Sequence, residues 1–113
     1  MLVKPGEKLF IITRRLFENQ LRRHFIGEVK EATESVVRID GYPFVFNEGT
    51  AEFTRKDRRV LIFGLADSGH IIYTIPQDVN LDELSYQISQ NDQLVITDGK
   101  AFELEISEFS HRR

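Results

Sequence analysis

The sequence Val-Val-Arg-Ile-Asp-Gly-Tyr-Pro-Phe-Val-Phe at residues 36–46 is the densest apolar run of the chain. β-branched and aromatic residues dominate this run, and such residues favour strands over helices. We expect it to form the centre of the core, with the segments on either side folded as strands that cover it. The sequence therefore predicts β structure at the middle of the protein.

The Asp40-Gly41 pair inside this run allows two interpretations. A type I′ hairpin turn needs positive φ at both central residues, which Asp tolerates and Gly adopts freely. The alternative is one continuous strand in which Gly41 forms a bulge. The hairpin is the preferred interpretation. Pro43 has no amide hydrogen, so it should lie at a sheet edge or with its nitrogen facing away from the hydrogen-bond ladder.

Further strands are predicted on both sides of the central run. The first apolar run, residues 9–12, has four consecutive apolar residues and no alternation of polar with apolar side chains. Its centre should therefore be covered on both faces. Gly27 lies inside a strand pattern and indicates a bulge or a close backbone approach. Asp98-Gly99 predicts a second hairpin. The expected strands are residues 9–12, 22–32, 51–55, 58–63, 70–75, 93–97 and 101–107.

One short helix is expected near residues 81–89. Asn80 is a good helix cap, and Glu83 follows three residues later, which together form a capping-box pattern. Apolar side chains then recur at helical spacing, at Leu81, Leu84 and Ile88.

These patterns predict an all-β, mainly antiparallel fold: a small meander that closes into a barrel or a two-layer roll. The 113 residues are expected to form a single β-rich domain, residues 1–113, which is long enough for one core. The chain has no cysteine, so disulfides, thiolate metal sites and cysteine nucleophiles are excluded. We found no signal-peptide pattern and no apolar run of membrane-spanning length. A cytoplasmic protein with no membrane partner is therefore expected.

Charge is distributed unevenly along the chain. The net charge is −3, too small to indicate a nucleic-acid or membrane partner by itself. Residues 1–63 carry twelve Lys and Arg against nine Asp and Glu, whereas residues 64–113 carry three against nine. One hypothesis is therefore structural: a homo-oligomer in which the basic half of one copy meets the acidic half of another.

The leading hypothesis is a non-catalytic binding module that uses a basic strand-end patch. If the strands at 9–12 and 22–32 pair antiparallel, their cations meet at one end of the sheet, where they can bind an acidic protein surface or a nucleic-acid backbone. The competing interpretation is a solvated strand end neutralised by nearby acids, because the chain is not basic overall. The candidate ligand-binding residues are Arg14, Arg15, Arg22, Arg23, His24 and Arg38.

No pattern predicts a catalytic, metal or cofactor site. Residues 67–70, Asp-Ser-Gly-His, include the residue types of a nucleophilic triad, but neighbours in a tight turn do not reach the geometry of one. The histidines have no metal-ligand spacing. The third and least favoured hypothesis is a small enzyme whose cleft contains His24, His70 and an acid such as Asp67.

Overall fold

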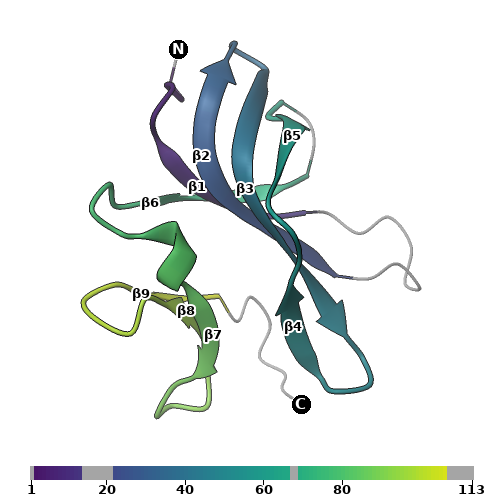
Figure 1. Ribbon diagram of the computed structural model, residues 1–113, viewed down its shortest axis with the longest axis vertical. Helices are drawn as coiled ribbons and strands as arrows, with labels where there is room; N and C mark the ends of the chain where they lie inside the picture. Colours follow the sequence, from purple (N-terminus) through teal and green to yellow (C-terminus); the bar gives the residue numbers. More distant parts are fainter. Residues whose placement is uncertain (1, 14–21, 67–68, 107–113) are drawn as a thin grey trace. The chain divides into compact units, whose positions relative to one another are not determined.

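The computed structural model describes residues 2–13, 22–66 and 69–106 (Figure 1). The chain forms two compact units, Met1–Gln77 and Asp78–Arg113, and each is described by itself. Both units consist of antiparallel strands, which confirms the predicted all-β class. The expectation of a single domain stays a prediction. No helix in the described ranges is long and apolar enough to cross a membrane.

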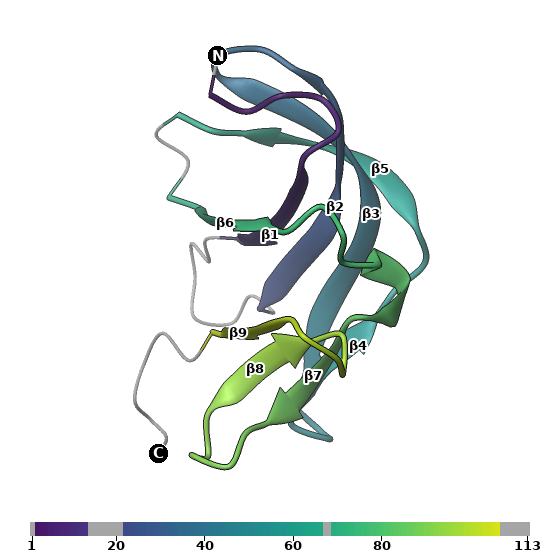
Figure 2. The ribbon, with the colours of Figure 1, turned by 90° about the vertical axis from the view of Figure 1, so that its left-hand side faces the viewer.

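The first unit is one six-stranded antiparallel sheet, with β3 as its longest strand. Its strand order is β4-β3-β2-β1-β6, and β5 also pairs with β3. Figure 2 shows β2 and β3 as the long, bent strands of this sheet. The strands are β1 (Lys8–Ile12), β2 (Arg23–Ala32), β3 (Val36–Asn47), β4 (Glu52–Arg55), β5 (Arg59–Gly64) and β6 (Ile71–Ile75).

The expected barrel does not close. Among the described strands, β6 pairs only with β1, while β4 and β5 pair only with β3. The reason lies in β3, which is long enough to hold two partners on one side. β4 pairs with its second half and β5 with its first half, so neither continues the sheet toward β6.

β3 runs without interruption through Asp40-Gly41, so the preferred hairpin was wrong. Gly41 pairs with Gly27 of β2 on one side and with Arg59 of β5 on the other, in regular register. The ladder is irregular instead between Val29 and Glu31 of β2, so the bulge is not at Gly41 either.

Gly27 and Gly41 allow the backbones of β2 and β3 to lie close together. A Cβ atom at Gly41 would lie 1.9 Å from the Ile26 carbonyl oxygen, and one at Gly27 would lie 2.5 Å from Ile39 Cγ2. Neither glycine is among the residues with positive φ. The expected close approach at Gly27 is therefore confirmed, and Gly41 is needed because no side chain fits there.

Pro43 lies where β3 changes partners. β5 pairs with β3 up to Gly41, and β4 begins opposite Phe44. The Pro43 carbonyl accepts a hydrogen bond from the Lys56 amide at 2.8 Å. Because the carbonyl and nitrogen of one strand residue point to the same side, the Pro43 nitrogen also faces this gap, where the ladder needs no donor.

The main core lies on one face of the sheet. β1 is also buried on its opposite face, since Leu9, Phe10 and Ile11 are at most 1% exposed, and this confirms that its centre is covered on both sides. Half-buried side chains of β5 and β6 pack against the same cluster. Residues that are far apart in sequence therefore become neighbours in the core. The buried members of the cluster are Leu9, Ile11, Phe25, Val29, Val37 and Ile39.

The second unit is a three-stranded sheet preceded by one turn of 3-10 helix. Its strand order is β7-β8-β9. The elements are η1 (Leu81–Glu83), β7 (Ser85–Ile88), β8 (Leu94–Thr97) and β9 (Glu103–Glu105).

The prediction of a helix near residues 81–89 was wrong beyond its first turn, because only Leu81–Glu83 is helical. The Asn80 side chain caps the turn, as expected, but it accepts a hydrogen bond from the Asp82 amide at 3.0 Å rather than from Glu83, whose side chain accepts from Lys100. Leu84 already has extended φ and ψ, and the chain continues as β7. Pairing with β8 outweighs a local helical preference that is only two to three turns long.

The hairpin about Asp98-Gly99 is confirmed. Gly99 has a φ of 76°, and Thr97 pairs with Glu103 across the loop. The Thr97 hydroxyl donates to the Phe102 carbonyl at 2.6 Å and accepts from the Gly99 amide at 3.0 Å. This buried hydroxyl therefore ties both sides of the loop together.

Candidate nucleic-acid interface

The predicted strand-end cluster is only partly within the described residues. Arg14 and Arg15 lie outside them. Arg22 and Arg23 are exposed at the start of β2, beside the end of β1, as expected. The Arg23 carbonyl accepts hydrogen bonds from the Thr13 amide at 3.1 Å and from its hydroxyl at 2.8 Å, which joins the two strand ends.

His24 is placed in this cluster but carries no charge at neutral pH. It is 8% exposed and stacks on Phe53, with ring centroids 4.3 Å apart. The Phe10 ring meets it edge-on at 5.2 Å. Burial, together with the charge of Arg22, lowers the pKa of His24 to about 4. His24 therefore acts as an aromatic spacer rather than as a cation.

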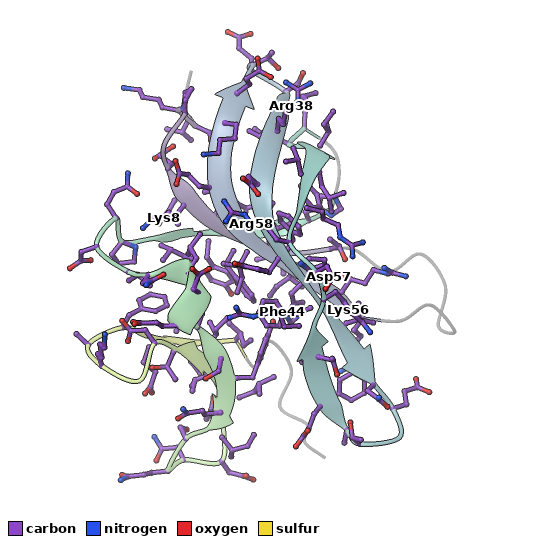
Figure 3. All side chains as sticks on the ribbon, viewed as in Figure 1. Lys8, Arg38, Phe44, Lys56, Asp57 and Arg58 are labelled. Carbon is purple, nitrogen blue, oxygen red and sulfur yellow. The ribbon has the colours of Figure 1, made fainter. Side chains whose placement is uncertain are left out.

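Arg38 does not join the other predicted site residues. It pairs in register with Glu31 near the end of β2, and the two side chains form an ion pair. Arg23 lies eight residues earlier on β2, which corresponds to about 26 Å at about 3.3 Å per strand residue. Figure 3 shows Arg38 at one end of β3 and Phe44 toward the other.

The structure brings a row of aromatic rings beside Arg22. Tyr42, Phe44 and Phe46 alternate along β3 and so point to the same face of the sheet. Cross-strand pairing places Arg55 opposite Phe44, and Phe53 opposite Phe46. We call this set the aromatic–arginine strip; its members are Arg22, Tyr42, Phe44, Phe46, Phe53 and Arg55.

Both arginines of the strip lie over aromatic rings. The guanidinium carbon of Arg55 is 4.6 Å from the Tyr42 ring centre and 5.4 Å from that of Phe44. Arg22 lies 5.7 Å from the Phe46 ring centre. These distances are in the range of cation–π attraction, which holds the cations against the sheet face.

A second group of cations lies where β4 leads into β5. Residues 55–59 read Arg-Lys-Asp-Arg-Arg, and we call this segment the basic corner. Arg58 donates from Nε and Nη2 to the two carboxylate oxygens of Asp40, each at 3.0 Å. Lys56 and Arg59 are exposed. The Lys56 amide donates to the Pro43 carbonyl, next to Phe44, whereas Arg58 lies farther along β3 at Asp40; Figure 3 labels Phe44, Lys56 and Arg58.

Two sequence patterns indicated the aromatic–arginine strip and the basic corner, but neither pattern could show that the two groups lie close together. The alternation of Tyr42, Phe44 and Phe46 is period two, and the basic corner is a dense run of cations. Their proximity depends on the β3–β4 register, which only the folded chain shows.

A surface depression of about 390 Å³ lies in the β3–β4 hairpin, lined in part by Val45, Thr54 and Lys56. No group of three or more potential metal ligands occurs in the described part of the chain. His70 meets Phe63 edge-on at 6.0 Å, and Phe63 packs on Phe25. Phe25 and His24 are consecutive on β2 and face opposite sides, so His70 packs on the face of β2 opposite to His24; Asp67 lies outside the described residues.

Charge differs between the two units. Met1–Gln77 contains twelve Lys and Arg against ten Asp and Glu, and Asp78–Arg113 contains three against eight. The strip and the basic corner therefore belong to the more basic unit.

Comparison of the chain with protein-family models, with curated proteins and with solved structures found no match. Function is accordingly inferred from the residues and their geometry.

Proposed function

We propose that the protein binds single-stranded nucleic acid across the aromatic–arginine strip and the basic corner. The observation that supports this most directly is the position of Arg55 over both Tyr42 and Phe44, on the sheet face where Arg22 lies over Phe46. Binding of this kind requires cations for the phosphates and flat aromatic surfaces for the bases.

The stacked guanidiniums suit both requirements. A guanidinium carries five N–H donors in its own plane, so it can contact phosphate oxygens at its edge while its face lies on a ring. The strip rings Tyr42, Phe46 and Phe53 are half-buried, which keeps part of each accessible to a base. The charge for the nucleic-acid backbone on this face comes from Arg22, Arg55 and Arg58, which bonds Asp40 there. The register places Arg59 opposite Gly41, on the other face of the sheet.

The length of the strip suits a short stretch of single strand. Tyr42 and Phe46 are four residues apart on one strand, which corresponds to about 13 Å. A duplex keeps its bases stacked inside and cannot use the rings. An acidic polypeptide would use the cations alone. Single-stranded nucleic acid is the ligand class that engages both kinds of side chain.

The test is fluorescence anisotropy of a labelled oligothymidine, titrated with the protein at low and at physiological salt. Arg55→Ala and Phe46→Ala are expected to weaken binding by about 5- to 160-fold each, since one base-stacking contact contributes about 1–3 kcal/mol. Arg38→Ala is the matched control, because it removes one arginine at the far end of β3 and should leave affinity nearly unchanged.

Three results would contradict the proposal. The first is no detectable binding at low salt. The second is equal loss of affinity in Arg38→Ala and Arg55→Ala. The third is complete competition by poly-glutamate at equal charge, which would indicate an acidic protein partner instead.

A second proposal is homo-oligomerisation through opposite charges, supported by the different charge of the two units. Such an assembly should weaken as salt rises, because salt screens exposed charges. Sedimentation at low and high salt tests it, and a monomer under both conditions would contradict it.

A further inference from the structure

β5 is an edge strand with an unpaired side. It pairs with β3 through residues 59–64, and no other described strand pairs with it. An edge of this kind presents free backbone donors and acceptors to a further strand.

The register identifies the residues whose backbone groups point outward. The Leu65 amide donates to the Ser35 carbonyl at 2.7 Å, which continues the β3–β5 ladder by one residue. In an antiparallel ladder, every second residue bonds to the partner strand. Arg59, Leu61 and Phe63 therefore face β3 with their backbone groups, while Val60, Ile62 and Gly64 face outward.

The side chains of this edge are apolar and exposed. Val60 is 53% exposed and Ile62 is 61% exposed, and Val36 on the neighbouring β3 is 39% exposed. A Cβ atom at Gly64 would meet nothing within 4 Å. Edge strands are usually protected by proline, a bulge or charge. Residues 60–64 contain neither a proline nor a charged side chain.

We infer that β5 pairs with β5 of a second copy of this chain, antiparallel and centred on Leu61. This register places Val60 of one copy opposite Ile62 of the other, and the reverse. The outward backbone groups of Val60 and Ile62 then meet as hydrogen-bonded pairs, in agreement with the alternation set by β3. Each exposed apolar side chain is covered by another.

Charge does not oppose a second copy in this antiparallel orientation. Arg58 and Arg59 stand at one end of β5, and antiparallel pairing carries the two ends apart. Arg59 lies opposite Phe63 of the second copy, so the two Arg59 residues are about 13 Å apart along the strands. This exceeds the Debye length of about 8 Å at physiological salt, so their repulsion is largely screened.

Cysteine cross-linking tests the register, and the chain offers a clean background because it has no cysteine. Hydrogen-bonded antiparallel pairs have Cα atoms about 5.5 Å apart, which a disulfide can bridge. Val60→Cys mixed with Ile62→Cys should form a mixed disulfide dimer under mild oxidation. Val60→Cys alone should not, because its two copies lie about 8 Å apart. Efficient cross-linking of Ile62→Cys alone would overturn the Leu61-centred register.

Sedimentation over a range of protein concentrations tests the association itself. The wild type is expected to form a reversible dimer as concentration rises, with little effect of salt. Ile62→Lys should remain a monomer at high salt, where an assembly through opposite charges is screened. Ile88→Lys is the matched control, because Ile88 is 63% exposed on β7, and it should dimerise as the wild type does.

A wild-type protein that stays monomeric at the highest concentration would overturn the inference, and would leave β5 as a docking strand for a peptide of another chain. Equal dimerisation of Ile62→Lys and the wild type would also overturn it. The nucleic-acid proposal is independent of both outcomes, because its variants lie on the aromatic–arginine strip.

Discussion

Arg58 binds Asp40 through two parallel hydrogen bonds, from Nε to Oδ1 and from Nη2 to Oδ2, each 3.0 Å long. Asp40 lies in the middle of β3, and Arg58 immediately precedes β5. The pair therefore attaches the basic corner to the longest strand of the sheet. The hydrogen bond from Arg58 is the main cause that lowers the pKa of the Asp40 carboxyl.

We predict that Asp40→Asn lowers the free energy of unfolding at neutral pH by about 0.5–1 kcal/mol, since Arg58 is 60% exposed and such pairs contribute modestly. The pKa of Asp40 is lower in the folded state than in the unfolded state. Its stabilising effect is thus present above about pH 4 and is lost as pH falls through the folded-state pKa. Urea unfolding should be measured at neutral pH and in acid, below about pH 4. The difference in the free energy of unfolding between Asp40→Asn and the wild type should be smaller in acid.

Glu31→Gln provides the comparison for Asp40→Asn. It removes the acid of the Arg38 pair, in which both side chains are more exposed than Asp40. We expect a change below about 0.5 kcal/mol. If Glu31→Gln and Asp40→Asn lowered the free energy of unfolding equally, the two hydrogen bonds between Arg58 and Asp40 would add no stability over a simple ion pair.

His24 should make the protein sensitive to mild acid. Its ordinary pKa is 6.5 and its folded-state pKa is about 4, so between these values only the unfolded state gains the proton. Stability should fall as pH drops through about 6.5 and stop falling below about 4, by about 3 kcal/mol in all. His24→Phe should flatten this part of the pH profile. A profile unchanged by the substitution would contradict the assignment.

Gly41→Ala should be strongly destabilising, by about 3 kcal/mol or more, or should prevent folding. Its Cβ atom would lie 1.9 Å from the Ile26 carbonyl oxygen, a backbone atom of the paired strand, so relief of the clash requires the two strands to move apart. Gly64→Ala is the control, because its Cβ would enter open space; it should change stability by less than about 1 kcal/mol. Thermal unfolding of the two variants measures the contrast, and similar melting temperatures would refute it.

Thr97→Val should loosen the β8–β9 hairpin. The substitution keeps the shape of the side chain but removes the hydroxyl that bonds both the Phe102 carbonyl and the Gly99 amide. The free energy of unfolding is expected to fall by about 1–2 kcal/mol, since the part-buried Phe102 carbonyl loses its shorter hydrogen bond and keeps the longer one from the Asp98 amide. Thr97→Ser retains the hydroxyl and should lose less. Chemical unfolding of both variants distinguishes the hydrogen bonds from the lost methyl group.

The two Asp-Gly pairs show how far local sequence predicts this fold. Asp98-Gly99 forms the predicted hairpin, and Gly99 has positive φ. Asp40-Gly41 lies within a run of strand-forming residues and stays extended, because pairing with β2 on one side and β5 on the other offers more hydrogen bonds than a turn. The same dipeptide thus adopts two conformations, because the strands that can pair with its flanking residues differ between the two sites.

The predicted helix ends after one turn, and Arg38 lies away from Arg22 and Arg23, for the same physical reason. Asn80 caps a turn as expected, but β8 then competes for the backbone that follows. Arg22 and Arg23 lie at the expected strand end, whereas Arg38 lies far from them at the other end of the sheet. Long-range register decides both cases, and a single sequence contains no direct record of it. The burial of His24 likewise depends on Phe53, which comes from a later strand.

β3 also sets an order for local opening. It pairs with β2 along nearly its whole length, while β4 and β5 each hold only one half of its other side. β4 can therefore detach without disturbing β5, and either loss leaves β3 bonded to β2. Amide hydrogens shared by β2 and β3 should exchange most slowly with solvent, and the aromatic–arginine strip spans the boundary between this slow pair and the faster β4. A ligand bound across that boundary would slow exchange most in β4, so the strand that opens most readily would also report binding.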